Sequence, residues 1–215
     1  MARPATDIRP RLLRAARARF LAHGVDGASL REIASAAGTS IGMVYYHFKT
    51  KDDLFLAVVE EVYGQVLADL EAALAPGPTV RERLRRLYRR IGALTDDELT
   101  VIRLVLREAL VSSARLDRLL ARFLRGHVPL VMSLLQEGVR DGTLDGGRPI
   151  VLLMMATFTL AGPPQFIRRA VRGRLPLADL AAGEALSDQL LEVLLGGIGA
   201  ARRKKRRVVR GAGAP

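Results

Sequence analysis

The stretch SLREIASAAGTSIGMVYYHFKTKDDLF, residues 29–55, contains two short helical patterns separated by a glycine. Its first half carries four apolar residues spaced i, i+3, i+4 and i+7, as on one face of an α-helix: Leu30, Ile33, Ala34 and Ala37. Gly38 supplies the backbone freedom that a turn requires, and a second short helix is expected over residues 40–46. This succession predicts a helix-turn-helix.

Helical patterns also flank this stretch on both sides. A helix over residues 8–23, ending at Gly24, is predicted by apolar residues at steps of four: Ile8, Leu12, Ala16 and Phe20. Further helices are expected over residues 79–94, 97–111, 115–141, 149–161, 164–173 and 178–199. Because no stretch alternates like a strand, the predicted fold class is all-α.

Two of the predicted helices begin with a capping pattern. Ser29 is followed three residues later by Glu32, which is the spacing of a capping box. Thr50 and Asp53 repeat that spacing at the start of a helix expected over residues 51–74. Both helix starts are therefore marked in the sequence.

The composition is that of a globular protein with 49% apolar and 26% charged residues and no cysteine. The absence of cysteine excludes disulfides and thiolate metal sites and fits a reducing compartment. The apolar run at residues 149–164 is too short to span a bilayer, so we expect a buried helix there and no membrane partner.

Positive charge is concentrated at the two ends of the chain. Residues 1–51 contain nine basic and three acidic residues, and residues 202–210 contain seven basic residues and no acidic one. Residues 52–201 are nearly neutral, with eighteen basic and nineteen acidic residues. Basic ends on a neutral body indicate a polyanionic partner.

The helix-turn-helix region resembles the DNA-binding domain of the tetracycline-repressor-like (TetR) family of transcriptional regulators. The resemblance covers roughly residues 8–60. It is carried by Phe20, Gly24, Ser29, Ile33, Ala34, Ala37, Gly38, Ser40, Gly42, Tyr45, His47, Phe48, Thr50, Lys51 and Leu54.

The resemblance implies a cytoplasmic, nucleoid-associated regulator with an N-terminal three-helix DNA-binding domain and a helical bundle for ligand binding and dimerisation. We assign the DNA-binding domain to residues 1–50, the bundle to residues 51–200 and a basic tail, expected to be disordered, to residues 201–215. The tail is equally compatible with extra phosphate contacts and with a merely solvated end.

The same resemblance gives the residues that would contact double-stranded DNA: Ser29, Thr39, Ser40, Ile41, Gly42, Met43, Tyr45, Tyr46 and Lys51. Ser29 and Lys51 would lie beside phosphates at helix N-termini, and the hydroxyl of Tyr45 would contact the backbone. Gly42 would let the helix sit close to the DNA. Thr39 stands where the family usually has valine.

Several of these side chains also have a structural interpretation. Phe48 fits a core face with Ile41 and Val44, and His47 is expected to fill an aromatic position and hydrogen-bond locally rather than bind a metal. If exposed, Ile41 and Met43 would contact thymine methyl groups or sugars. The helix 1 arginines could contact phosphate or form a solvated face: Arg9, Arg11, Arg14, Arg17 and Arg19.

The sequence of the helical bundle indicates its function less specifically than that of the helix-turn-helix. Candidate residues for binding a small-molecule effector are Arg103, Arg107, Met132, Met154, Met155 and Phe158, although methionine and phenylalanine at helical spacing are also typical of a core. By family analogy, the helices over residues 149–161 and 178–199 would form the homodimer. A stripe on the second of them consists of Leu186, Leu190, Val193 and Leu194.

The sequence therefore predicts a ligand-responsive DNA-binding regulator, by resemblance a repressor that binds a palindromic operator as a homodimer and is released by an unidentified small molecule. The alternative is a constitutive or architectural DNA-binding protein without a ligand, which the basic tail favours. No nucleophile, metalloprotease or nucleotide-binding motif is present, so we expect no enzyme activity, metal or cofactor.

Overall fold

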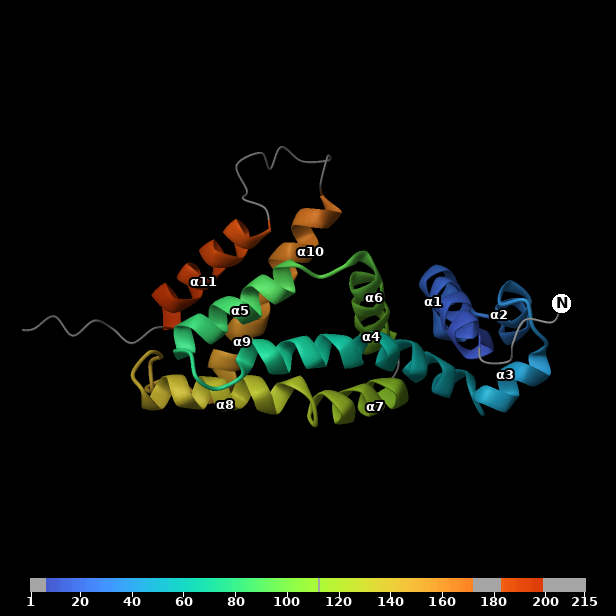
Figure 1. Ribbon diagram of the computed structural model, residues 1–215, viewed down its shortest axis with the longest axis horizontal. Coiled ribbons are helices and arrows are strands. Elements are labelled where there is room, and N and C mark those ends of the chain that lie inside the picture. Colours follow the sequence, from blue (N-terminus) through green and yellow to red (C-terminus); the bar gives the residue numbers. More distant parts are fainter. Residues whose placement is uncertain (1–6, 112, 172–182, 199–215) are drawn as a thin grey trace, which may run out of the picture.

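The computed structural model describes residues 7–111, 113–171 and 183–198, and these residues form helices joined by short turns (Figure 1). No strand occurs among them, as the predicted all-α class requires. In chain order the helices are α1 (Ile8–Gly27), α2 (Leu30–Ala36), α3 (Ile41–His47), α4 (Lys51–Leu74), α5 (Val80–Gly92), α6 (Asp96–Val111), α7 (Ser113–Phe123), α8 (His127–Arg140), α9 (Ile150–Ala161), α10 (Pro163–Ala170) and α11 (Glu184–Ile198).

Helices α1, α2 and α3 form a unit at one end of the molecule, and α4 runs from this unit into the larger bundle (Figure 1). The core of the unit is built on Phe20 and Phe55, whose rings meet edge to face at 6.0 Å. Val44 and Phe48 anchor α3 to the same core, so the interpretation of Phe48 as a core residue is confirmed. The first half of α4 therefore belongs to the core of the N-terminal unit.

Two glycines with positive φ angles allow the chain to change direction within this unit. Gly24 (φ 75°) interrupts α1 where the sequence predicted the helix to end, and Gly38 (φ 64°) forms the turn after α2. At Gly24 an added Cβ would also lie 2.9 Å from the guanidinium of Arg107 on α6. A side chain at Gly24 would therefore disturb both the backbone and the contact between α1 and α6.

The two predicted capping boxes differ in outcome. Thr50 and Asp53 form theirs, since Asp53 N donates to Thr50 Oγ1 at 3.0 Å and Thr50 N donates to Asp53 Oδ2 at 3.1 Å. Ser29 is the N-cap of α2, but its side chain makes no capping hydrogen bond. Glu32 instead pairs with Arg19 at 3.4 Å, so the capping box predicted at Ser29 is wrong.

A second core lies between α4, α5, α8, α9 and α11. Tyr88 on α5 is fully buried there and donates its hydroxyl proton to the carbonyl of Thr157 on α9 at 3.2 Å. Burial raises the pKa of Tyr88, so the phenol stays protonated.

The single helix predicted over residues 115–141 is wrong. The chain forms α7 and α8 instead, with residues 124–126 between them. Pro129 in the first turn of α8 has no backbone N–H and cannot continue an α-helical hydrogen-bond ladder from α7. Gly126 leaves room for Tyr63, because a Cβ there would lie 2.1 Å from the tyrosine oxygen.

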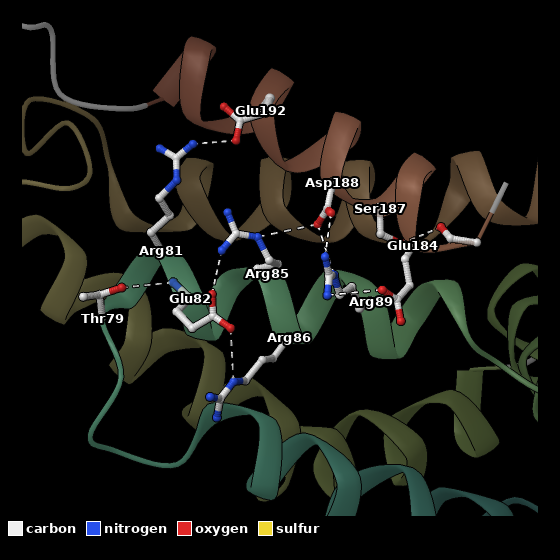
Figure 2. Close-up of polar contacts among 11 residues, drawn as sticks. Thr79, Arg81, Glu82, Arg85, Arg86, Arg89, Glu184, Ser187, Asp188 and Glu192 are labelled. Carbon is white, nitrogen blue, oxygen red and sulfur yellow. Dashed lines mark hydrogen bonds and ion pairs between the residues drawn. The ribbon is translucent and has the colours of Figure 1, made fainter. Parts of the chain in front are cut away.

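Helix α11 packs antiparallel on α5 through a row of ion pairs (Figure 2). We call this row the α5–α11 ladder; it consists of Arg81, Arg85 and Arg89 on α5 and Glu184, Asp188 and Glu192 on α11. Most of the apolar stripe predicted for a partner chain faces inward, since Leu186 and Leu194 are buried in this chain and Val193 remains exposed. The predicted helix start at residue 178 and the predicted disordered tail lie outside the described residues.

One stretch among the described residues, Ile150–Arg169, is apolar and long enough to be considered as a membrane span, with a mean hydropathy of 1.6. It comprises two helices that meet at Gly162, and the twelve residues of α9 measure only about 18 Å, against about 30 Å for a bilayer core. The expectation of a buried helix is wrong for one face of α9, where Val151, Leu152 and Met155 are exposed.

Candidate functional site

Helix α3 presents an exposed aromatic and polar face at the end of the molecule. Ser40 is its N-cap and accepts a hydrogen bond from the backbone N–H of Met43 at 3.4 Å. Tyr45 and Tyr46 are 55% and 79% exposed, an unusual state for two adjacent large side chains. Neither ring contributes to the core, so both are available to a partner.

Gly42 lies on this exposed face in an ordinary helical conformation. A Cβ added there would meet only the Ser40 hydroxyl, at 3.7 Å, which is normal van der Waals contact. The fold therefore does not require glycine at position 42, although glycine lowers the stability of a helix. Close approach of another molecule would account for it.

The other residues predicted on this face are less exposed. Thr39 and Met43 are half-buried, and Ile41 is half-buried against the N-terminal core. The expectation of a local hydrogen bond for His47 is wrong, because its buried Nε2 has no partner among the described residues. Its ring instead packs on those of Tyr46 and Phe48.

Ser29 and Lys51 flank the face at the starts of α2 and α4. The Ser29 hydroxyl is free of a capping role, which leaves it able to bond a phosphate. The Lys51 ammonium already donates to the carbonyl of Asp26 at 2.7 Å and to that of Ala28 at 3.2 Å. An ammonium has three protons, so one remains for a phosphate oxygen. The phosphate contact of Lys51 stays a prediction.

The arginines of α1 divide between two tasks. Arg17 pairs with Glu61 and with Asp97, both at 2.9 Å, and thereby ties α1 to α4 and α6. Arg11, Arg14 and Arg19 line a groove that reaches the α2–α3 turn at Gly38. Arg11 pairs with Asp7 at 3.6 Å and Arg19 with Glu32 at 3.4 Å, so phosphate contacts by the α1 arginines stay predictions.

A cavity of about 370 Å³ lies in the larger bundle between α4, α5, α6, α8 and the α9–α10 junction. Its walls are almost entirely apolar. They are formed by Val59, Val62, Tyr63, Val66, Leu70, Leu87, Ile91, Leu94, Glu98, Val101, Ile102, Val105, Leu106, Phe123, His127, Val131, Phe158, Ala161, Gly162 and Phe166. The volume falls within the range of small-molecule pockets.

Four rings cluster on one side of this cavity: Tyr63, Phe123, His127 and Phe158. Tyr63 Oη lies 3.0 Å from His127 Nδ1 and accepts the backbone N–H of His127 at 3.2 Å. Burial, together with the charge of nearby Arg122, lowers the pKa of His127. The imidazole is therefore neutral near pH 7.

The acidic residue in the wall, Glu98, is neutralised within the protein. Arg90 binds both of its carboxylate oxygens, and the backbone N–H of Thr95 donates to it at 2.8 Å. Burial opposes ionisation of Glu98, but these hydrogen bonds outweigh it and lower the pKa of the carboxyl group. The walls accordingly offer no unpaired cation or anion among the described residues.

Of the six residues predicted to bind an effector, Phe158 lines the cavity. Arg107 lies against Gly24, Arg103 is exposed, and Met155 is 60% exposed on α9. Effector contacts by these three and by Met132 and Met154 stay predictions. The sequence did not identify Tyr63 and His127, because they are 64 residues apart and no local pattern relates them.

Arg115 on α7 joins the bundle to the N-terminal unit. Its buried guanidinium bonds Asp26 at 2.8 and 3.0 Å, Asp52 at 3.0 Å and the buried carboxylate of Glu108. We call these four residues the Arg115 cluster. Glu108 of α6 thus pairs with a residue of α7 and not with Arg103 or Arg107 of its own helix.

The cavity and the N-terminal core share several residues. Val59 and Tyr63 on α4 and Val101 on α6 are buried in the N-terminal core and also line the cavity. A molecule in the cavity would therefore touch the same helices that support α1, α2 and α3.

The comparisons with known proteins agree with this geometry. Residues 12–58 match the model of the bacterial regulatory proteins of the tetR family. The chain belongs to the TetR family. It is accordingly a DNA-binding transcriptional regulator, and the match covers α2, the turn and α3, the elements that carry the exposed face.

TetR-family relatives resemble different parts of the chain. The fatty acid metabolism regulator protein of Bacillus subtilis is 25% identical over 139 residues, which are 63% of this chain and 70% of that protein. The repressor AcnR of Corynebacterium glutamicum is 41% identical over 56 residues, only 26% of this chain and 30% of the repressor. The crystal structure of Bacillus subtilis FadR in complex with stearoyl-CoA superposes with a TM-score of 0.71 and 22% identity. The superposition covers 88% of this chain and 98% of the FadR chain. At that identity, the likeness shows the fold.

Proposed function

We propose that this TetR-family regulator is a homodimeric repressor that binds a palindromic operator and leaves it when an apolar effector fills the cavity. The observation that carries the proposal is the pair of shared helices: α4 and α6 line the cavity and also support the DNA-binding unit. An effector that favours a different spacing of α4 and α6 would thereby favour a different position of α3.

Dimerisation supplies the geometric constraint on α3. Two recognition helices bind successive major grooves when their centres are about 34–36 Å apart. The exposed apolar face of α9, with Val151, Leu152 and Met155, together with Val193 on α11, supports a dimer through these two helices. A change in the position of α4 would alter the α3 separation and reduce affinity for the operator.

The Arg115 cluster supports the coupling because it fastens the start of α4 and the end of α1 to α6 and α7. The chemistry of the effector is supported by the apolar cavity walls and by the fold of FadR, whose structure was solved with stearoyl-CoA. The regulators among the relatives also support a cytoplasmic role on DNA rather than an enzyme activity.

The proposal is tested by selecting sites that the full chain binds from random DNA and then adding acyl-CoA esters of different chain length. We expect a palindrome with two half-sites about one helical turn apart, and release by at least one chain length. Recovery of no common sequence, or complexes that no apolar ligand dissociates, would overturn it.

Gly42→Ala tests the DNA-facing assignment of α3. The variant should be as stable as the wild type, or more stable by up to about 1 kcal/mol, because alanine favours a helix. Its operator affinity should nevertheless fall at least tenfold, since the new methyl group would occupy the space of close approach to DNA. Unchanged affinity in a binding titration would contradict the assignment.

A further inference from the structure

The polar pair in the cavity wall fixes one tautomer of His127. Tyr63 Oη accepts the backbone N–H of His127 and lies 3.0 Å from Nδ1 of the same residue. A phenol that already accepts from one neighbour satisfies both groups by donating its proton to the other, so Nδ1 is the acceptor. The neutral imidazole then carries its proton on Nε2.

This Nε2–H is a donor without a protein acceptor among the described residues. The imidazole ring packs against three rings that line the cavity, at centroid distances of 5.8 Å to Tyr63, 5.2 Å to Phe123 and 5.6 Å to Phe158. His127 lines the cavity, so its edge away from Tyr63 is open to an acceptor on a molecule bound there.

The charges around His127 restrict the acceptor that this donor can take. Arg122 lies over the Tyr63 ring at 4.6 Å. Its Nε and Nη2 each donate to a carboxylate oxygen of Glu60 at 2.8 Å. Glu98, the acid in the wall, is already paired with Arg90. A carboxylate in the cavity would find no free cation among the described residues of the wall, and burying it unpaired would be strongly unfavourable.

We propose that His127 Nε2–H donates to an uncharged carbonyl oxygen of the effector, so that the cavity selects an apolar chain bearing an ester, thioester or ketone group. The inference rests on the proposed function, because it specifies the effector of the same cavity. Tyr63 is the positioning residue, since it fixes the tautomer and orientation of His127.

The test compares two ligands that differ only at the carbonyl: a twelve-carbon acyl-CoA thioester and the corresponding alkyl-CoA thioether. With the full chain, isothermal titration calorimetry should show the thioester binding about tenfold more tightly, as expected for one hydrogen bond in a dry site. The methyl ester and the methyl ether of the same chain length repeat the comparison without CoA, so a preference in both pairs assigns it to the carbonyl alone.

Two variants of similar size separate the ring nitrogens. His127→Gln places an amide nitrogen near the position of Nε2, whereas His127→Asn places one near Nδ1. The glutamine variant should keep most of the thioester preference, and the asparagine variant and His127→Phe should bind the two ligands with equal affinity. Each protein is compared with itself on two ligands, so a loss of folded protein does not alter the ratio.

A preference for the thioester that persists in His127→Asn and His127→Phe would overturn the assignment of the donor. Equal binding of both ligands by the wild type would also overturn it, while release of the operator by those ligands would leave the proposed function intact. If neither ligand binds and no apolar ligand releases DNA, both proposals fail.

Discussion

Arginine holds helices together in two parts of this molecule, and the surroundings of the two sets differ. The Arg115 cluster has a buried central pair, since the side chains of Arg115 and Glu108 are 8% and 4% exposed, although its Asp26 lies at the surface. The α5–α11 ladder lies at the surface, where the side chains of Arg89 and Asp188 are 40% and 39% exposed (Figure 2). The ladder has more ion pairs, but burial makes the Arg115 cluster the more consequential of the two.

The two sets also join different kinds of partners. The Arg115 cluster connects α7 to α1, α4 and α6, and α7 otherwise meets α4 over only a short surface. The ladder lies over an apolar contact in which Leu191 and Leu194 of α11 are already buried. Removing charges should therefore loosen the first contact and leave the second in place.

The largest effect is expected for Arg115→Met. This change leaves the buried Glu108 carboxylate without a counter-ion, and breaking such a pair costs about 3–5 kcal/mol of unfolding free energy. Urea denaturation measures the loss. Arg118→Met is the matched control on the same helix, because Arg118 is 57% exposed and pairs only weakly with Asp53 at 3.4 Å.

A second variant distinguishes an unpaired charge from lost packing. Adding Glu108→Gln to Arg115→Met removes the buried charge and should recover part of the lost stability. If Arg115→Met loses less than about 1 kcal/mol of unfolding free energy, the Arg115 cluster behaves like a surface ion pair. The cluster would then be no more important for stability than the α5–α11 ladder.

The next effect concerns the packing under the ladder. Gly92→Ala would place a methyl group 2.3 Å from Ser187 Oγ and 3.2 Å from Gln165 Nε2, and such overpacking typically costs about 1–3 kcal/mol. Gly196→Ala on α11 is the control, since a Cβ there meets nothing within 4 Å and should stabilise the helix.

Combining Gly92→Ala with Ser187→Ala removes the hydroxyl that the methyl group would meet. The double variant should therefore be more stable than Gly92→Ala alone in the same urea measurement. A Gly92→Ala variant with wild-type stability would show that the α5–α11 contact is looser than the structure indicates.

Local patterns allowed much of the DNA-facing unit to be predicted from the sequence. The turn at Gly38, the Thr50 cap and the exposed tyrosines of α3 all depend on residues a few positions apart. The capping box at Ser29 was predicted wrongly because Glu32 has a competing partner, Arg19, on a neighbouring helix. Such competition is invisible in a local pattern.

The cavity and the Arg115 cluster depend on residues far apart in the chain. Tyr63 and His127 are separated by 64 positions, and Arg115 and Asp26 by 89. Periodicity indicates which face of a helix is apolar but not which helices enclose a void. The break before α8 is different, because Gly126 and Pro129 mark it locally in the sequence and the prediction of one helix passed over them.

The pH dependence of stability tests how strongly Arg115 holds Asp26 in its ionised form. The hydrogen bond from Arg115 is the main reason that the pKa of Asp26 is lowered below 3.8, with burial opposing it and the charges of Arg115 and Lys51 assisting. The folded state thus holds the ionised carboxylate, so its contribution is present above pH 3.8 and is lost as the pH falls through the lower folded pKa.

We therefore expect the unfolding free energy to decline less steeply with acid in Arg115→Met than in the wild type. Urea denaturation between about pH 6 and pH 3 measures both slopes. Asp188 also has a lowered pKa, through its hydrogen bond from Arg89. Its contribution to the unfolding free energy should be lost equally in both proteins, because neither changes Arg89. Parallel curves would show that Arg115 does not hold Asp26 ionised.

The smallest effect is expected for Arg89→Ala in the ladder. Arg89 bonds Asp188 at 2.7 and 3.2 Å and Glu184 at 3.2 Å, but the geometry alone does not make these pairs strong, because water screens them. The loss should stay below about 1 kcal/mol at low salt and shrink further in 1 M NaCl, where the Debye length is about 3 Å. A loss above about 2 kcal/mol that salt does not reduce would mean that the ladder, and not the close contact at Gly92, fixes α11 on α5.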